Sequence, residues 1–147
     1  MEDELYLIAR VASQWLALPA VSVEAVVAVR DVVPAPLAPP SVRGLVAIRS
    51  RLLTLIDTAL VAGEQTFGDA APLMAIVAID GHGYGLALDE VEDVVALPMA
   101  DVPARLGSGW QALASGVADH QDGRALLRLD PADVIAVLNS RALDAAA

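Results

Sequence analysis

Apolar residues occur along this chain in runs of five to eight, rich in Val, Ile and Leu and separated by Gly, Pro, Asp and Ser. Runs of this length between turn residues predict β-strands joined by tight turns. In the first half of the chain they predict strands over 5–11, 15–18, 23–29, 44–48 and 52–56. In the second half they predict strands over 73–79, 84–88, 91–97, 115–118 and 124–129.

These segments form two copies of one pattern, about 70 residues apart. A Val-Glu stretch begins at Val23 and again at Val91, and a later segment begins at Gly44 and again at Gly116. Five short strands in each copy remove their exposed edges best by closing into a small barrel. We therefore predict a mainly β fold of two five-stranded barrels lying side by side with a groove between them.

The remaining segments complete the expected domain. Asp130 is a suitable N-cap, Pro131 suits the first helical position, and Val134 and Leu138 are spaced as one helical face, so a short C-terminal helix is expected. The proline-rich segments should be extended loops. The proline-rich segments are 33–40 and 98–109. We expect a single domain over 1–147 with two repeats, 5–61 and 73–138, connected by 62–72. Strands could be exchanged between the two barrels.

Charge and composition exclude several classes of protein. The net charge is −10 and the nine basic residues are all arginine and scattered, which disfavours nucleic acid and anionic membranes as partners. Without lysine or cysteine the chain has no P-loop, Schiff base, thiolate nucleophile or zinc-thiolate site. Its longest uncharged stretches, 11–23 and 106–118, fall short of the roughly 18 residues of a membrane span. With an acidic N-terminus unlike a signal peptide, we expect a cytoplasmic protein.

The glycines and histidines indicate turns rather than a catalytic centre. The segment 81–85 superficially resembles a phosphate loop, but a strand follows it where a helix is required, which favours a hairpin turn. His82 lies in that turn, and His120 lies in another between Asp119 and Asp122. Such close donors in one tight turn rarely converge on a metal. We therefore expect no catalytic residue, no cofactor and no metal.

Two charged clusters leave alternatives open. Asp89, Glu90, Glu92 and Asp93 could form a solvated face or a charged contact with a partner, and the remote alternative is a small hydrolase that uses these acids. The second cluster holds a third of the basic residues within nine positions, at a predicted hairpin tip: Arg43, Arg49 and Arg51. Arginines there suit either contact with a partner carboxylate or simple solubility of the turn.

The order and spacing of several motifs together resemble one family. These motifs are Leu18-Pro19, Val23-Glu24-Ala25-Val26, Pro36 to Pro40 followed by Gly44 to Ser50, Leu52 to Asp57, Gly85 to Asp89, Gly116-Val117 and Leu129-Asp130-Pro131. From Leu5 to Leu138 the chain is similar to the CheW-like domain family, whose members are adaptors of bacterial chemotaxis. The resemblance implies two SH3-like barrels with a hydrophobic groove between them.

The resemblance also implies a function and partners. It implies a non-catalytic adaptor of a chemosensory array that binds the regulatory domain of a CheA-type histidine kinase and the cytoplasmic tip of chemoreceptors. Other CheW-like domains are further candidate partners, and neither nucleic acid nor membrane insertion is expected. The array would place the protein in the cytoplasm. The partner-binding residues carried over are Arg43, Arg49, Val23, Val26, Val91, Val94 and Val95.

Four positions depart from the family pattern. Ala25 stands where Glu is usual, Ala47 where Asn is common, Ser50 where Gly is usual and Thr54 where Pro is usual. The first change removes a charge and the third constrains the turn beside Arg49. These departures support a second hypothesis, a CheW-like paralogue in a non-flagellar pathway such as surface motility or development.

Overall fold

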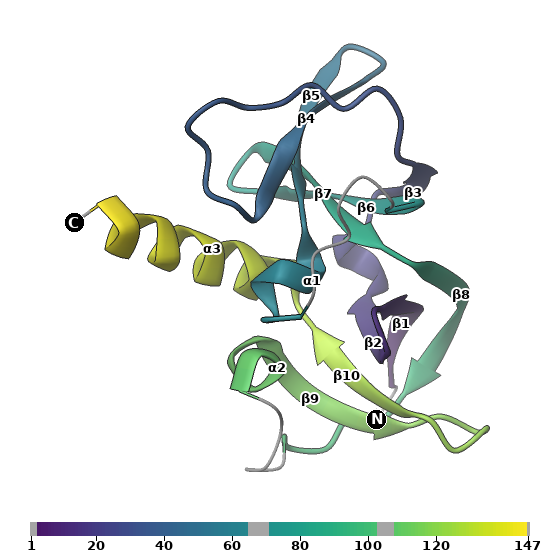
Figure 1. The fold of residues 1–147 in the computed structure, drawn as a ribbon. Helices are drawn as coiled ribbons and strands as arrows, with labels where there is room; N and C mark the ends of the chain where they lie inside the picture. Colours follow the sequence, from purple (N-terminus) through teal and green to yellow (C-terminus); the bar gives the residue numbers. More distant parts are fainter. Residues whose placement is uncertain (1–2, 65–70, 103–107, 147) are drawn as a thin grey trace.

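The ten predicted strands are confirmed in a computed structural model that describes residues 3–64, 71–102 and 108–146 (Figure 1). The strands of the first half are β1 (Glu4–Val11), β2 (Gln14–Pro19), β3 (Ala25–Ala28), β4 (Val42–Ile48) and β5 (Arg51–Ile56). Those of the second half are β6 (Leu73–Ile79), β7 (His82–Leu88), β8 (Glu90–Leu97), β9 (Ala114–Asp119) and β10 (Ala125–Leu129).

The strands form two five-stranded sheets with the same internal order. One sheet runs β8-β1-β2-β10-β9 and the other β3-β6-β7-β5-β4. We call them barrel I and barrel II; barrel II lies in the upper part of Figure 1 and barrel I in the lower part. The opening hairpin of each sequence copy therefore pairs with the last three strands of the other copy. The second strand of each opening hairpin pairs in parallel with the last strand of the other copy: β2 with β10, and β7 with β5.

Each sheet closes through one isolated bridge at equivalent positions of the two copies. In barrel II, Val33 and Leu45 exchange backbone hydrogen bonds of 2.9 and 2.7 Å between nitrogen and oxygen. In barrel I, Ala100 and Val117 exchange bonds of 2.8 and 3.0 Å. Closure satisfies the edge strands, which is the expected solution for sheets this small.

Short helices fill the space around the barrels. They are the 3₁₀ turn η1 (Ala20–Ser22), α1 (Thr58–Val61), α2 (Ser108–Leu113) and α3 (Pro131–Ala146). Asp57 caps α1, since its Oδ1 accepts a 3.0 Å hydrogen bond from the Leu60 nitrogen. Asp130 accepts a 3.0 Å bond from the Ala132 nitrogen, so the predicted start of α3 is confirmed. No helix in the described part of the chain is long and apolar enough to cross a membrane.

The main core lies between the barrels rather than inside either one. Its buried side chains come from both sheets and from the three α-helices, for example Leu18, Leu88, Val61, Trp110 and Leu138. In Figure 1, α1 and α3 lie at the level where the barrels meet. Barrel II has its own smaller interior cluster around Leu53 and Met74, and barrel I has one around Tyr6 and Ile8. The apolar faces that meet between the barrels therefore hold the two together.

Three predicted elements are wrong in detail. The proline-rich segment 33–40 is not uniformly extended, because the Ala38 nitrogen bonds the Ala35 oxygen at 3.3 Å and closes a turn. The segment 98–109, expected to be an extended loop, contains the start of α2 at Ser108, while its residues 103–107 lie outside the described residues. The third strand is also shorter than 23–29, because Val23 follows η1 as its C-cap.

Candidate functional site

Three of the five predicted valines pack against the core that the two barrels share. Val23 follows η1, Val26 lies in β3 and Val91 lies in β8, and all three are half-buried against the central core. Val23 and Val26 reach this core from barrel II, and Val91 reaches it from barrel I. We call these three residues the junction valines.

The other two valines lie on opposite faces of β8, as neighbours in a strand must. Val94 pairs with Leu7 and points outward, whereas Val95 pairs with Tyr6 and packs into the interior of barrel I. Val94 can therefore contact a partner directly. Val95 is accessible to a partner only through the cavity described below.

The exposed apolar surface near Val94 includes residues that the sequence prediction missed. Val21 of η1 is 92% exposed, Leu5 of β1 is 54% exposed and Val94 itself is 51% exposed. η1 packs beside β1, and β1 pairs with β8, so we call these three residues the β1–β8 face. The sequence does not show that Leu5 is exposed, because apolar residues occupy both faces of β1 and do not alternate with polar ones.

Arg49 lies at the tip of the β4–β5 hairpin. Ile48 pairs with Arg51, so Arg49 and Ser50 form the turn, and Arg49 itself takes a left-handed backbone with φ 56°. Ser50 stands where the family usually has glycine, and its neighbour Arg49 has a strained backbone conformation. Among the arginines whose side chains the structure describes, Arg49 and Arg30 are the two without an ion pair. The exposed Arg49 guanidinium is available to a partner.

An ion pair ties this hairpin tip to the junction of the barrels. The Arg51 Nη1 atom lies 2.5 Å from the Glu24 Oε2 atom. Glu24 directly follows Val23, so the tip that presents Arg49 is held at the same end of barrel II as the junction valines. An exposed pair contributes little stability, on the order of 0–1 kcal/mol, but it restricts where the tip can lie.

Arg43 has an intramolecular partner. Its Nε atom lies 3.8 Å from Oδ2 of Asp57, a fully buried carboxylate. A buried carboxylate needs a nearby positive charge to offset the cost of its desolvation. Removal of Arg43 would take part of that positive charge away from Asp57. This contact gives Arg43 a structural role beside its predicted role in partner binding.

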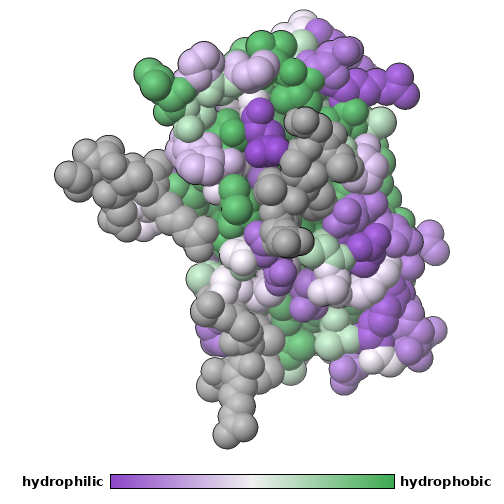
Figure 2. All heavy atoms as spheres, in the orientation of Figure 1, coloured by the Kyte–Doolittle hydropathy of each residue, from purple (hydrophilic) through white to green (hydrophobic). Residues whose placement is uncertain are grey.

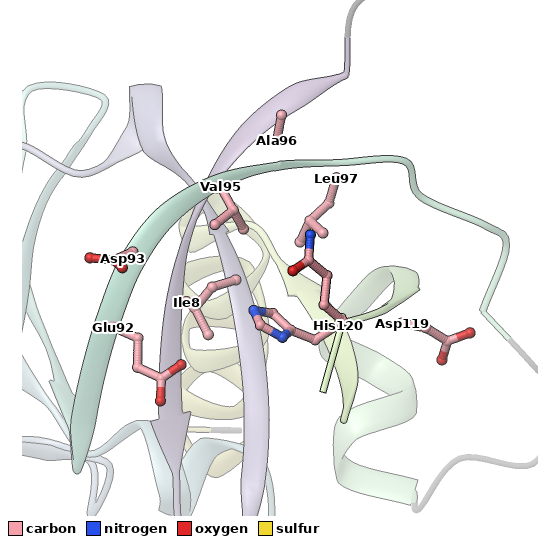
Figure 3. Close-up of a pocket in the computed structure, with 9 residues that line it drawn as sticks. Ile8, Glu92, Asp93, Val95, Ala96, Leu97, Asp119 and His120 are labelled. Carbon is pink, nitrogen blue, oxygen red and sulfur yellow. The ribbon is translucent and has the colours of Figure 1, made fainter. Parts of the chain in front are cut away.

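A cavity of about 530 Å³ opens between β8 and β9 in barrel I (Figure 3). Its apolar lining consists of Ile8, Val95, Ala96 and Leu97, and its polar lining consists of Glu92, Asp93, Asp119, His120 and Gln121. The strands separate here because barrel I closes further along, at the bridge between Ala100 and Val117. Sequence reasoning missed this cavity, since its walls come from β1, β8 and the β9–β10 turn.

The acidic cluster is largely engaged within the molecule. Asp89 accepts a 2.7 Å hydrogen bond from the Ala12 nitrogen, Arg10 Nε lies 3.2 Å from Glu90, and Arg124 Nη2 lies 2.7 Å from Glu92. These contacts give three of the four acids structural partners. These contacts favour a structural role for the three acids over the small hydrolase.

Arg124 organises this end of barrel I. Its guanidinium lies 4.0 Å from the centre of the Trp15 ring and binds both Glu92 and Asp122. The hydrogen bonds that the Arg124 guanidinium donates to Glu92 raise the pKa of Arg124. The backbone N–H of Arg124 lowers the pKa of Asp122 below its usual value, with help from the arginine side chain. The network keeps these groups charged and orders the β9–β10 turn.

The two histidines have separate partners. His120 Nδ1 lies 3.1 Å from Asp122 Oδ1 in barrel I. In barrel II, His82 Nε2 lies 2.9 Å from Thr54 Oγ1, and the His82 ring lies beside the Tyr84 ring at a tilt of 46°. The described residues contain no group of three or more His, Cys, Asp and Glu side chains placed to hold a metal ion. The segment 81–85 turns at Gly81 and continues as β7.

Two barrels with a shared core, an exposed apolar face and an arginine without an ion pair at a hairpin tip are typical of a protein-binding module. The family model of the CheW-like domain matches residues 5–139, so the chain belongs to this family, one of non-catalytic chemotaxis scaffolds. The crystal structure of the scaffolding protein TtCheW from Thermoanaerobacter tengcongensis has a similar fold, with a TM-score of 0.75 at 20% identity, over 88% of this chain and 85% of that one. No curated protein matches the chain.

Proposed function

We propose that this chain couples chemoreceptors to a CheA-type histidine kinase in a cytoplasmic chemosensory array, without catalytic activity of its own. The observation that carries this proposal is Arg49: exposed, without an ion pair, and held by the Arg51–Glu24 pair at the same end of barrel II as the junction valines. Membership of a scaffold family supports the same role.

The apolar residues would supply most of the affinity. Burial of an exposed Val or Leu side chain contributes about 1.5–3 kcal/mol before the costs of association. Val21, Leu5 and Val94 are exposed enough to contribute to the affinity on binding. Val23 and Val91 are half-buried and pack against the central core. Arg49 would fix the register of the complex through a carboxylate on the partner.

The direct test is a titration of the full chain with a purified kinase regulatory domain and, separately, with a soluble receptor tip. Arg49→Glu should weaken binding about 10-fold to 100-fold, since it replaces an attractive charge by a repulsive one. Arg30→Glu is the matched control: it makes the same charge change at the other arginine without an ion pair, and should change binding less than threefold. Both variants should melt like the wild type.

Two outcomes would contradict the proposal. If the folded wild type binds neither partner, the coupling function is wrong. If Arg49→Glu and Arg30→Glu weaken binding equally, the effect comes from net charge and Arg49 has no specific role.

A second candidate is a paralogue that serves a non-flagellar pathway, and the exposed position of Ala25 favours it. Ala25 lies on β3 next to Val26, where the usual glutamate would present a charge to a partner. Ala25→Glu should then strengthen binding to a kinase domain of flagellar chemotaxis. If instead that kinase domain binds the wild type tightly and Ala25→Glu does not improve binding, the flagellar assignment is favoured.

A further inference from the structure

Barrel I is open along one side, between its two terminal strands. β8 and β9 end the strand order β8-β1-β2-β10-β9, and within the described residues they pair only at the bridge between Ala100 and Val117. The cavity of about 530 Å³ lies in this opening. Small-molecule sites have volumes of roughly 300–1,000 Å³, so the barrel has room for a ligand without a change of fold.

The floor of this cavity is apolar. Ile8 is fully buried in the interior cluster of barrel I, and Val95 and Leu97 pack against the same cluster from β8. In Figure 3 both Val95 and Leu97 project from β8 toward the side on which His120 lies. An apolar floor of this kind favours a ligand with an apolar body and disfavours a hydrated inorganic ion.

The rim of the cavity offers negative charge. Glu92, Asp93 and Asp119 are part of it, and no arginine is among the described residues that line it. Arg124 pairs with Glu92, but each carboxylate oxygen keeps a second lone pair. Asp93 and Asp119 form no ion pair with a described residue. Figure 3 shows these two side chains projecting outward on opposite sides of the cavity, so they act on a ligand through their field rather than by contact.

Two further side chains complete the rim. His120 Nδ1 lies 3.1 Å from Asp122 Oδ1, and a proton on that nitrogen leaves Nε2 as a hydrogen-bond acceptor. Gln121 adds an amide oxygen. Figure 2 shows hydrophilic residues along the right edge of barrel I, where Figure 1 places β8 and the β9–β10 turn. The opening of the cavity is therefore acidic and rich in acceptors, whereas its floor is apolar.

This combination selects one class of ligand. A primary ammonium group carries one positive charge and three N–H donors, which match the charge and the acceptors of the rim. A bare metal ion does not fit, because the described residues contain no group of three or more His, Cys, Asp and Glu side chains placed to hold one. An anion would be repelled by the carboxylates, and a purely apolar molecule would leave the acceptors of the rim unused.

We propose that barrel I binds a small primary ammonium compound with a compact apolar body in the cavity between β8 and β9. The ammonium group lies at the rim beside Glu92 and His120, and the apolar body covers Ile8, Val95 and Leu97. The site uses neither the β4–β5 hairpin tip nor the β1–β8 face. It therefore does not depend on the proposed coupling function.

The test is a titration of the full chain with 2-phenylethylammonium, followed by NMR at the methyl groups of Ile8, Val95 and Leu97. We expect saturable shifts of these methyl signals. 2-Phenylethanol has the same apolar body without the charge, and it should bind at least about tenfold more weakly. 3-Phenylpropanoate carries the opposite charge and ethylammonium lacks the ring, so neither should saturate the same signals.

A double variant tests the charge of the rim. Asp93→Asn combined with Asp119→Asn removes two exposed carboxylates and should weaken the binding of 2-phenylethylammonium about threefold to tenfold. Asp31→Asn combined with Asp80→Asn is the matched control, because both acids are exposed in loops of barrel II and asparagine accepts their positive φ. The control changes the net charge equally and should alter the affinity less than about twofold. Both double variants should melt like the wild type.

Four results would overturn the proposal. If no methyl signal of the cavity shifts, a ligand of this class does not bind there. If 2-phenylethanol binds as tightly as 2-phenylethylammonium, the cavity selects apolar molecules without regard to charge. If the two double variants weaken binding equally, the overall charge of the protein attracts the ligand and the rim has no specific role. If N-acetyl-lysine methylamide binds more tightly than 2-phenylethylammonium, the cation belongs to a protein partner rather than to a free small molecule.

Discussion

Gly44 and Gly116 lie at equivalent places, next to the bridges that close the two barrels, but their surroundings differ. A Cβ atom on Gly44 would lie 2.3 Å from the Val33 oxygen, and Gly44 has φ +147°. A Cβ atom on Gly116 would lie 3.4 Å from the Ala100 oxygen, which is an ordinary contact. The sequence repeat identified both glycines, but only the packing shows that one of them is required.

We expect Gly44→Ala to lower the free energy of unfolding by about 2–4 kcal/mol, because the methyl group would displace the carbonyl that closes barrel II. Gly116→Ala should cost less than about 1 kcal/mol. Urea denaturation of both variants checks this difference. If both variants lose the same free energy of unfolding, the contact between the added methyl group and the Val33 carbonyl does not destabilise barrel II.

Valines 94 and 95 illustrate the limit of sequence reasoning at the residue scale. The repeat assigns both to a partner-binding surface, but neighbouring strand residues face opposite ways. Which of them faces outward depends on the register of β8 against β1, where Val94 meets Leu7 and Val95 meets Tyr6. That register is a property of the tertiary structure.

At the scale of elements, the strands were predictable and the short α-helix α1 was not. Each strand is a run of apolar residues between turn formers, and this signal is local. Helix α1 has four residues, too few for a helical period to show in the sequence. It forms because Asp57 caps it and because Ala59 and Val61 are buried in the central core.

Asp57 supports this element in two ways, so its replacements should differ. Asp57→Ala removes both the cap of α1 and the partner of Arg43, and should lower the free energy of unfolding by about 2–4 kcal/mol. Asp57→Asn keeps an oxygen that can accept from the Leu60 nitrogen, and should cost about half as much.

Thermal denaturation of the two Asp57 variants measures the difference. Asp130→Ala at the start of α3 is the control for a cap without a buried ion pair, and about 1 kcal/mol is expected there. If Asp57→Ala costs no more than Asp130→Ala, the contact with Arg43 contributes nothing.

At the scale of the whole molecule, the exchange of hairpins makes the two sequence copies interdependent. Barrel I takes β1 and β2 from the first copy, and barrel II takes β6 and β7 from the second. Neither copy contains a complete barrel, and the main core is built from both.

This topology predicts that neither half of the chain folds alone. Fragments 1–66 and 67–147 should each lack a cooperative unfolding transition, because each would expose the faces that its partner's hairpin covers. An equimolar mixture should regain the β-sheet signal and a single transition, as followed by circular dichroism. A cooperative transition in either isolated fragment would contradict the interdependence of the two barrels.

The sequence alone determined the number of strands, the two-fold repeat, the C-terminal helix and the family, because these depend on local patterns and on the order of motifs along the chain. It also pointed to Arg49 as a contact residue. Only the tertiary structure decided that the hairpins are exchanged, that Val94 faces solvent while Val95 faces inward, that Arg43 pairs with Asp57, and that a cavity opens between β8 and β9. These features depend on pairing between residues far apart in sequence, and strand pairing at long range leaves no local signal to read.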